Sequence, residues 1–175
     1  FEGPERLRSK GRSMGWNIDA LERSGAVELM WQTPGEAMLD EIAARMLAAV
    51  ARRGVRRLVI DGLSGFAESA VDPERLNRFF GCLTNELRNA GVTVLMTLET
   101  RDVVSSVIST PFGVSSFVDN LVFLRFVHDE GELVRLLTLI KMRDSNYEAG
   151  LHRMRIDQNG IQIVGRYRAG DDIIP

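Results

Sequence analysis

Helix-like and strand-like segments alternate along the first part of the chain, and this alternation constrains the fold more than any other feature. Residues 36–53 and 72–91 carry apolar side chains at helical spacing, whereas residues 58–60 and 92–99 are continuously apolar runs. Such runs between amphipathic helices are typical of strands buried on both faces of a parallel sheet. Right-handed crossovers between these strands predict a mostly parallel sheet with helices on both faces, so the expected fold class is α/β.

The chain opens with two predicted short helices and a further strand. Residues 4–16 contain helix formers after a proline, and residues 17–25 form a short helical segment that a glycine closes. Residues 26–31 alternate between apolar and polar side chains, which favours a strand. The parallel sheet is therefore expected to gain a strand before residue 36.

A different pattern follows the alternating part. Residues 120–127 and 132–143 are strand-like runs separated by a short polar turn, which predicts an antiparallel pair. Residues 152–164 surround an Asn-Gly dipeptide, which is the strongest short signal for a β-hairpin. Antiparallel strands are therefore expected to complete the domain at its C-terminal side.

Composition describes an ordinary globular domain. The chain has 175 residues, of which 45% are hydrophobic and 26% charged, so one domain with a sizeable core is expected over residues 1–175. The net charge of −2 gives no general attraction to nucleic acid, and the sequence has neither an apolar run of membrane-spanning length nor a signal peptide. The single cysteine, Cys82, has apolar neighbours, which predict a buried thiol in a reducing, cytoplasmic environment.

Asp61 directly follows the apolar run at residues 58–60 and precedes a Gly-rich turn. An ionised carboxylate is costly to bury without a cation or several donors, so this position favours a metal, an amide nest or a helix end. A Walker B aspartate, which holds Mg²⁺ beside a nucleotide, is one solution. The structural alternative is a residue at a strand end that caps the next turn.

A Walker B aspartate requires a phosphate-binding loop, and the sequence does not contain one. The G-x-x-x-x-G-K-[ST] pattern is missing, as are G-x-G-x-x-G, C-x-x-C, H-E-x-x-H and G-x-S-x-G. His128 and His152 stand apart in the sequence, which gives little support for zinc. If Asp61 serves a nucleotide, a phosphate-binding loop is still required, and these motifs do not supply it.

Several motifs in the same order resemble the KaiC-like family of circadian-clock ATPases, protein kinases and their relatives outside clocks. The motifs are FEGPERL, SMGWNIDALERSG, RRLVIDGLSGF, VTVLMTLET, FVDNLVFLRFVHDEGELVRLLTLIKMRDSNY and RIDQNGIQI. The resemblance runs from Phe1 to about Val164. It implies a three-layer RecA-like domain of the P-loop NTPase type, incomplete at its N-terminus, where the first strand and the P-loop are missing.

The resemblance also implies a function for the full protein. Members bind and hydrolyse ATP with Mg²⁺ at the subunit interfaces of a homo-hexameric ring, some have Ser/Thr autokinase activity, and clock or signalling proteins are their partners. The 175 residues alone are expected to be inactive because the phosphate loop is missing. No membrane is expected as a partner, and nucleic acid is disfavoured.

The resemblance assigns catalytic roles to a few residues. Asp61 matches the Mg²⁺ partner, acting through water, although relatives often have Ser where this chain has Gly62. Glu2 matches a carboxylate that orients the attacking water, and the alternative is an exposed residue at the terminus. Lys141 and Arg143 lie two apart at a strand end, so both point to one side and favour an anion between them. In the family these cations reach the γ-phosphate in the neighbouring subunit; otherwise they are solvated cations at an edge strand.

Further nucleotide contacts are implied beside these residues. Met142, Ser145 and Tyr147 fall in the family segment that lies near the cations, the sugar and the base. Thr97 and Glu99, at the end of the strand that follows Asp61 in the chain, could sense the γ-phosphate or simply face solvent. These five positions are the predicted cofactor contacts.

Ser115 and Ser116 fall near the tandem phosphorylated pair of the clock protein, although a serine pair in a loop is usually only a loop. Two other classes of protein stay open. One is a non-catalytic RecA-fold module for assembly or signalling, which the sequence upstream of Phe1 would decide. The other is a RecA-type DNA recombinase, but residues 101–120 hold Arg101 as their single cation, so little binding to single-stranded DNA is expected.

Overall fold

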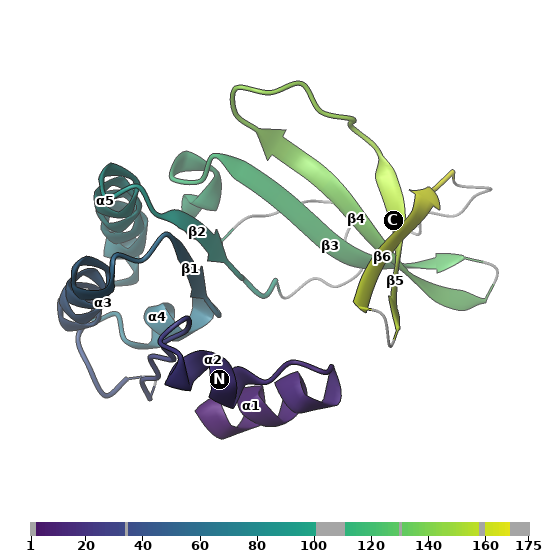
Figure 1. The fold of residues 1–175 in the computed structure, drawn as a ribbon. Coiled ribbons are helices and arrows are strands. Elements are labelled where there is room, and N and C mark those ends of the chain that lie inside the picture. Colours follow the sequence, from purple (N-terminus) through teal and green to yellow (C-terminus); the bar gives the residue numbers. More distant parts are fainter. Residues whose placement is uncertain (1–2, 34, 101–110, 130, 158–159, 169–175) are drawn as a thin grey trace. The chain divides into compact units, whose positions relative to one another are not determined.

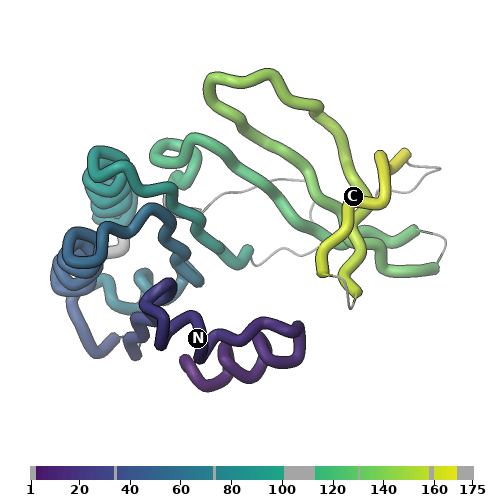
Figure 2. Tube along the Cα trace, in the orientation of Figure 1, coloured from purple at the N-terminus to yellow at the C-terminus, as the bar shows by residue number. Residues whose placement is uncertain are grey.

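The computed structural model describes residues 3–33, 35–100, 111–129, 131–157 and 160–168 (Figures 1 and 2). The chain divides into two compact units, Phe1–Glu99 and Thr100–Pro175. The first unit contains α1 (Pro4–Ser13), α2 (Ile18–Arg23), α3 (Leu39–Arg53), β1 (Arg57–Ile60), α4 (Ser64–Glu68), η1 (Pro73–Arg75), α5 (Leu76–Asn89) and β2 (Thr93–Met96). Within the described ranges, no helix is both long and apolar enough to cross a bilayer.

Helices α1 and α2 form the pair that the sequence predicts at the start of the chain. Gly11 permits their close approach, because a Cβ at this position would lie 2.6 Å from Cγ1 of Ile18. Arg8 on α1 donates to both carboxylate oxygens of Glu22 on α2, at 2.7 and 3.0 Å. This hydrogen bonding holds the pKa of Glu22 below its ordinary value.

Strands β1 and β2 pair in parallel, which confirms the arrangement expected from the alternating segments. Ile60 lies beside Met96 in the register, and Ile60 is buried. Helix α5 contacts β2 and α3. The opposite face of the pair carries Val59 and Leu95, each 62% exposed, so the described residues do not supply the helix layer expected there.

Residues 26–31 do not form the predicted strand. The backbone of residues 27–33 lies outside both sheets of the described chain. The N–H groups of Ala26 and Val27 instead donate to the carbonyl of Leu21, at 2.9 and 3.2 Å, and so continue the turn that ends α2. The prediction was wrong because alternation marks an extended, half-buried segment but does not provide a partner for a ladder.

Cys82 is exposed, so the predicted buried thiol is also wrong. The buried face of α5 is formed by side chains three and four positions apart, namely Leu76, Phe80, Leu83 and Leu87. Cys82 lies off this face although its neighbours in sequence are apolar. Helical spacing decides its environment more strongly than local composition.

The second unit is an antiparallel sheet with strands in the order β3-β4-β5-β6. Its elements are η2 (Pro111–Ser116), β3 (Asn120–Asp129), β4 (Glu132–Met142), β5 (Leu151–Asp157) and β6 (Gly160–Arg166). The pairings β3-β4 and β5-β6 confirm the predicted antiparallel pair and hairpin. The core of this unit consists of buried Val127, Val134 and Leu136, with Leu151 and Tyr167 packed against them.

Candidate functional site

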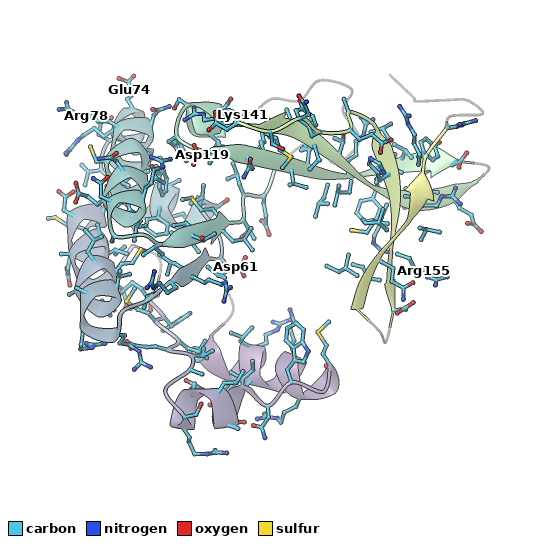
Figure 3. The ribbon with its side chains drawn as sticks, turned by 45° about the horizontal axis from the view of Figure 1, so that its top comes forward. Asp61, Glu74, Arg78, Asp119, Lys141 and Arg155 are labelled. Atoms are coloured by element: carbon cyan, nitrogen blue, oxygen red, sulfur yellow. The ribbon has the colours of Figure 1, made fainter. Side chains whose placement is uncertain are left out.

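Asp61 and Thr97 meet where β1 and β2 end. Each residue directly follows its strand, and the carboxyl ends of parallel neighbours lie at the same edge of a sheet. The Asp61 side chain, labelled in Figure 3, is exposed. The Thr97 hydroxyl donates to its Oδ1. The sequence placed both residues at strand ends, but it did not identify the bond between them.

The backbone around Thr97 fixes this contact from both sides. The N–H of Thr97 donates to the carbonyl of Ile60 at 3.0 Å, and the N–H of Leu63 donates to the carbonyl of Thr97 at 2.8 Å. A Cβ at Gly62 would lie 3.0 Å from Oγ1 and 3.3 Å from the carbonyl oxygen of Thr97. A side chain at position 62 would therefore press on the Thr97 hydroxyl, which explains why glycine suits the position after Asp61.

The donor set at this edge suits Mg²⁺ in part. An exposed carboxylate is a hard oxygen ligand, and among the described residues Oδ2 of Asp61 accepts no hydrogen bond. The described residues contain no group of three or more His, Cys, Asp or Glu side chains that could hold a metal. Mg²⁺ retains several waters and takes phosphate oxygens readily, so one carboxylate acting through water is compatible with it.

A cleft of about 210 Å³ borders Asp61 in the first unit. Residues 28–33 form one wall, and β1 with the turn into α4 forms another. The lining is mixed, with apolar side chains such as Trp31 and Phe66 beside the charged Arg45. It is smaller than typical pockets for drug-sized ligands, which are about 300–1,000 Å³. Sequence analysis did not identify this cleft, since two of its lining residues, Met30 and Trp31, were predicted to lie in a paired strand.

Glu99 is exposed two residues beyond Thr97, and the structure shows nothing that assigns it to a phosphate. Glu2 lies outside the described residues. The predicted role of each therefore stays a prediction.

Lys141 lies near the end of β4 and holds the segment that leads into β3 (Figure 3). Its ammonium group donates to the carbonyl of Ser115 at 2.7 Å and to that of Val118 at 2.8 Å. These carbonyls lie at and just beyond the end of η2. A basic side chain placed in this way hydrogen-bonds the carbonyls at the end of a helix and so stabilises that end.

Arg143 reaches the same segment. Its Nη1 lies 3.1 Å from Oδ1 of Asp119, and its backbone N–H donates to the Asp119 carbonyl at 3.0 Å. Both side chains are about half exposed, at 50% and 43%. Lys141 and Arg143 therefore both contact the segment before β3, where they meet carbonyl oxygens and Asp119. Sequence reasoning missed Asp119, although an acidic residue just before a predicted strand was a usable signal.

The remaining predicted contacts lie around this strand end without converging on one point. Met142 is half-buried at the last position of β4, and Ser145 is exposed with its hydroxyl donating to Asn146 at 3.1 Å. The Tyr147 hydroxyl donates to the carbonyl of Ile140 at 3.2 Å. The candidate phosphorylation sites Ser115 and Ser116 are both exposed in η2.

Comparisons with known proteins agree with this architecture of a parallel and an antiparallel sheet. The chain is 26% identical over 173 residues to the circadian clock oscillator protein KaiC of Parathermosynechococcus lividus, covering 99% of this chain and 32% of that protein. It is 24% identical to the KaiC of a Picosynechococcus strain, covering 99% of this chain and 33% of the relative. For the KaiC of Thermostichus vulcanus the identity is 25%, with the same coverages of 99% and 33%.

The chain thus spans about a third of the length of the curated relatives it matches. A family model described as the KaiC ATPase matches residues 2–167, which is nearly the whole chain. The fold is accordingly RecA-like α/β, with helices, a parallel pair and an antiparallel sheet. The chain belongs to the KaiC ATPase family.

Proposed function

We propose that the full-length protein binds and hydrolyses ATP with Mg²⁺, and that these 175 residues supply the metal side of its nucleotide site. The observation that carries the proposal is the exposed Asp61 carboxylate at the end of β1, with one oxygen held by Thr97 from the neighbouring strand. Open α/β sheets bind ligands beyond the carboxyl ends of their strands, which is where this pair lies.

Nucleotide hydrolysis requires that the negative charge of the phosphates is offset and that a water molecule is oriented for attack. Mg²⁺ offsets the negative charge of the phosphates, and Asp61 would hold it through water. Glu2 would orient the attacking water, and Thr97 and Glu99 would lie near the γ-phosphate. The phosphate-binding loop would come from outside these 175 residues, because they contain no G-x-x-x-x-G-K-[ST] pattern.

In this proposal, Lys141 and Arg143 at the end of β4 act on the nucleotide of a neighbouring subunit in a homo-hexameric ring. Lys141 uses two of its N–H groups on carbonyls, and Arg143 uses one side-chain nitrogen on Asp119. An ammonium and a guanidinium both carry further N–H donors, so each can bind a phosphate while it keeps its present partner. Met142, Ser145 and Tyr147 would then lie near the sugar and base of that nucleotide.

The deciding experiment compares Asp61→Asn with Asp40→Asn in the full-length protein. Asp40 is an exposed carboxylate in the first turn of α3, so the control removes the same charge away from the strand ends. Loss of the metal's partner should lower kcat about 10²-fold, comparable to removing one preorganised electrostatic group from an active site. Unchanged turnover in Asp61→Asn would make Asp61 a turn residue and overturn the proposal.

The same preparation separates the alternative classes. A wild-type protein that assembles but binds no Mg-ATP would indicate a non-catalytic RecA-fold module for assembly or signalling. Binding to single-stranded DNA that weakens steeply with salt would indicate a RecA-type recombinase. The net charge of −2 supports neither strong nor general DNA binding.

Autophosphorylation is a second candidate function, because Ser115 and Ser116 are both exposed in a short helix whose end Lys141 holds. Incubation of the full-length protein with Mg-ATP, followed by peptide mass spectrometry, should then find phosphate on residues 113–119. Ser115→Ala with Ser116→Ala should remove it, whereas Ser24→Ala, at an exposed serine away from the site, should not. Phosphate at neither serine would overturn this second function.

A further inference from the structure

Thr97 contacts Asp61 through a single side-chain hydrogen bond, and this bond defines a role for Thr97 other than contact with a phosphate. The hydroxyl donates to Oδ1, and within the described residues Oδ2 has no hydrogen-bond partner. We propose that Thr97 is a positioning residue, which fixes the Asp61 carboxylate so that Oδ2 faces the hydrated metal. The inference rests on the proposed function and deepens it, because it gives Thr97, near the γ-phosphate, a role that acts through Asp61.

The backbone makes Thr97 suitable for this role. Its N–H is bonded to Ile60 and its carbonyl accepts from Leu63, so the residue is held to β1 and to the turn beyond it. Threonine is branched at Cβ, which restricts χ1 and keeps the hydroxyl in few orientations. The donor to Asp61 is therefore placed by two backbone bonds and a stiff side chain.

Gly62 is the second requirement for this arrangement. A Cβ there would lie 3.0 Å from the Thr97 hydroxyl oxygen, closer than ordinary van der Waals contact. The hydroxyl can occupy its place beside Asp61 because position 62 carries no side chain. Gly62→Ala should therefore shift the Thr97 hydroxyl by a few tenths of an ångström and weaken its hydrogen bond to Asp61.

An unheld carboxylate at the surface would rotate, and water would replace the lost donor. Because Asp61 is exposed, this replacement should cost little stability. It should nevertheless weaken metal binding, since partners that orient a metal-binding carboxylate typically contribute about 10–100-fold to affinity or activity. Metal affinity and fold stability should therefore respond differently to the same substitution.

The test measures Mn²⁺ binding to the full-length protein in the presence of ATP by electron paramagnetic resonance, with Mn²⁺ as the probe for Mg²⁺. Thr97→Val keeps the shape of the side chain without the hydroxyl, and its Kd for Mn²⁺ should rise about tenfold. Thr97→Ser restores the hydroxyl and should bind like the wild type. Thr93→Val, an exposed threonine at the start of β2, is the matched control and should change nothing.

Hydrogen exchange of the Leu63 amide shows whether the strand ends remain intact, because this N–H donates to the Thr97 carbonyl. Its protection should be equal in wild type, Thr97→Val and Thr97→Ser. Thr97→Ala serves as a second variant without the hydroxyl if Thr97→Val loses this protection.

The outcomes distinguish this inference from the proposed function. A wild-type protein that binds no Mn²⁺ with ATP would overturn the proposed function and, with it, the role of Thr97. A wild type that binds Mn²⁺, with equal affinity in a folded Thr97→Val or Thr97→Ala, would overturn the positioning role alone. A weakened Thr97→Val beside an unaffected Thr97→Ser would establish it.

Discussion

The ends of β1 and β4 both carry charged side chains, but these side chains differ in how many partners the protein provides for them. At the end of β1 the Asp61 carboxylate is exposed and held by one hydroxyl. At the end of β4 the Lys141 ammonium holds two carbonyls, and Arg143 is paired with Asp119. The first charge is left with capacity for a ligand, whereas the second pair is already engaged by the protein itself.

Strand direction explains this difference. In a parallel pair both strands end at the same edge, so the residues that follow them are adjacent while the chain leaves by a crossover. In an antiparallel pair the end of one strand lies beside the start of the next, and Asn120 does lie opposite Met142. The segment before β3 therefore lies within reach of cations at the end of β4, and its carbonyls satisfy them.

The largest effect is expected for Arg143, whose substitution tests whether a cation already paired within the protein also acts on ATP. In the full-length protein, Arg143→Ala should lower ATP hydrolysis about 10³-fold, as expected for a cation that stabilises transferring phosphate. Glu2→Gln should be similarly inactive. Mixed rings of the two variants contain some interfaces with both wild-type residues, so part of the activity should return in a steady-state assay.

Asp119→Asn is the matched control for this comparison, because it breaks the ion pair but keeps Arg143. A half-exposed ion pair contributes about 0–1 kcal/mol, so Asp119→Asn should fold and keep most of its turnover. If mixed rings form and remain inactive, or if Asp119→Asn is as impaired as Arg143→Ala, then Arg143 serves the fold alone.

A smaller effect is expected for the lysine that holds the turn. The amides of Phe117 and Val118 donate to the carbonyl of Val114, at 3.2 and 3.3 Å, in the turn that Lys141 supports. Lys141→Gln should speed their exchange with deuterium about 10–100-fold, since one hydrogen bond to a charged group contributes about 1.5–3 kcal/mol. Lys10→Gln, which replaces the other lysine of the sequence, should leave both amides unchanged. Equal exchange in the two variants would show that the turn is stable without Lys141.

The smallest effect concerns α1 and α2, where the protein again satisfies its own cation. The hydrogen bond from Arg8 lowers the pKa of Glu22 from its ordinary value of 4.5. A lowered pKa adds stability that is present above pH 4.5 and is lost as the pH falls through the folded-state value. The methyl NMR signals of Ile18 should change in one step as the pH falls and this stability is lost. Glu22→Gln should remove that step. An unchanged step in Glu22→Gln would assign it to another group.

Sequence alone predicted the elements that carry the site better than the contacts within it. The strand into Asp61, its parallel neighbour, the antiparallel pair and the hairpin all follow from periodicity and turn residues, and the structure confirms them. Residues 26–31 failed because pairing depends on an available partner and not on alternation. Cys82 failed because apolar neighbours in sequence lie on different faces of a helix.

The contacts were harder to predict for two physical reasons. The partners of Lys141 are backbone carbonyls, which every residue carries and no sequence pattern marks. The bond from Thr97 to Asp61 depends on the register of two strands, although both residues were predicted at strand ends. Sequence analysis shows that Gly62 departs from relatives. A Cβ at this position would lie 3.0 Å from Oγ1 of Thr97, and only the three-dimensional arrangement shows this close contact.

The exposed apolar face of β1 and β2 should make the 175-residue chain prone to associate in solution. Parallel sheets are normally covered on both faces, yet Val59 and Leu95 are each 62% exposed on neighbouring strands. A solution of this chain alone should therefore bind a hydrophobic dye such as ANS and should associate as its concentration rises. Replacing both residues with threonine, which keeps the branched shape suited to strands, should improve its colloidal stability with little change in secondary structure.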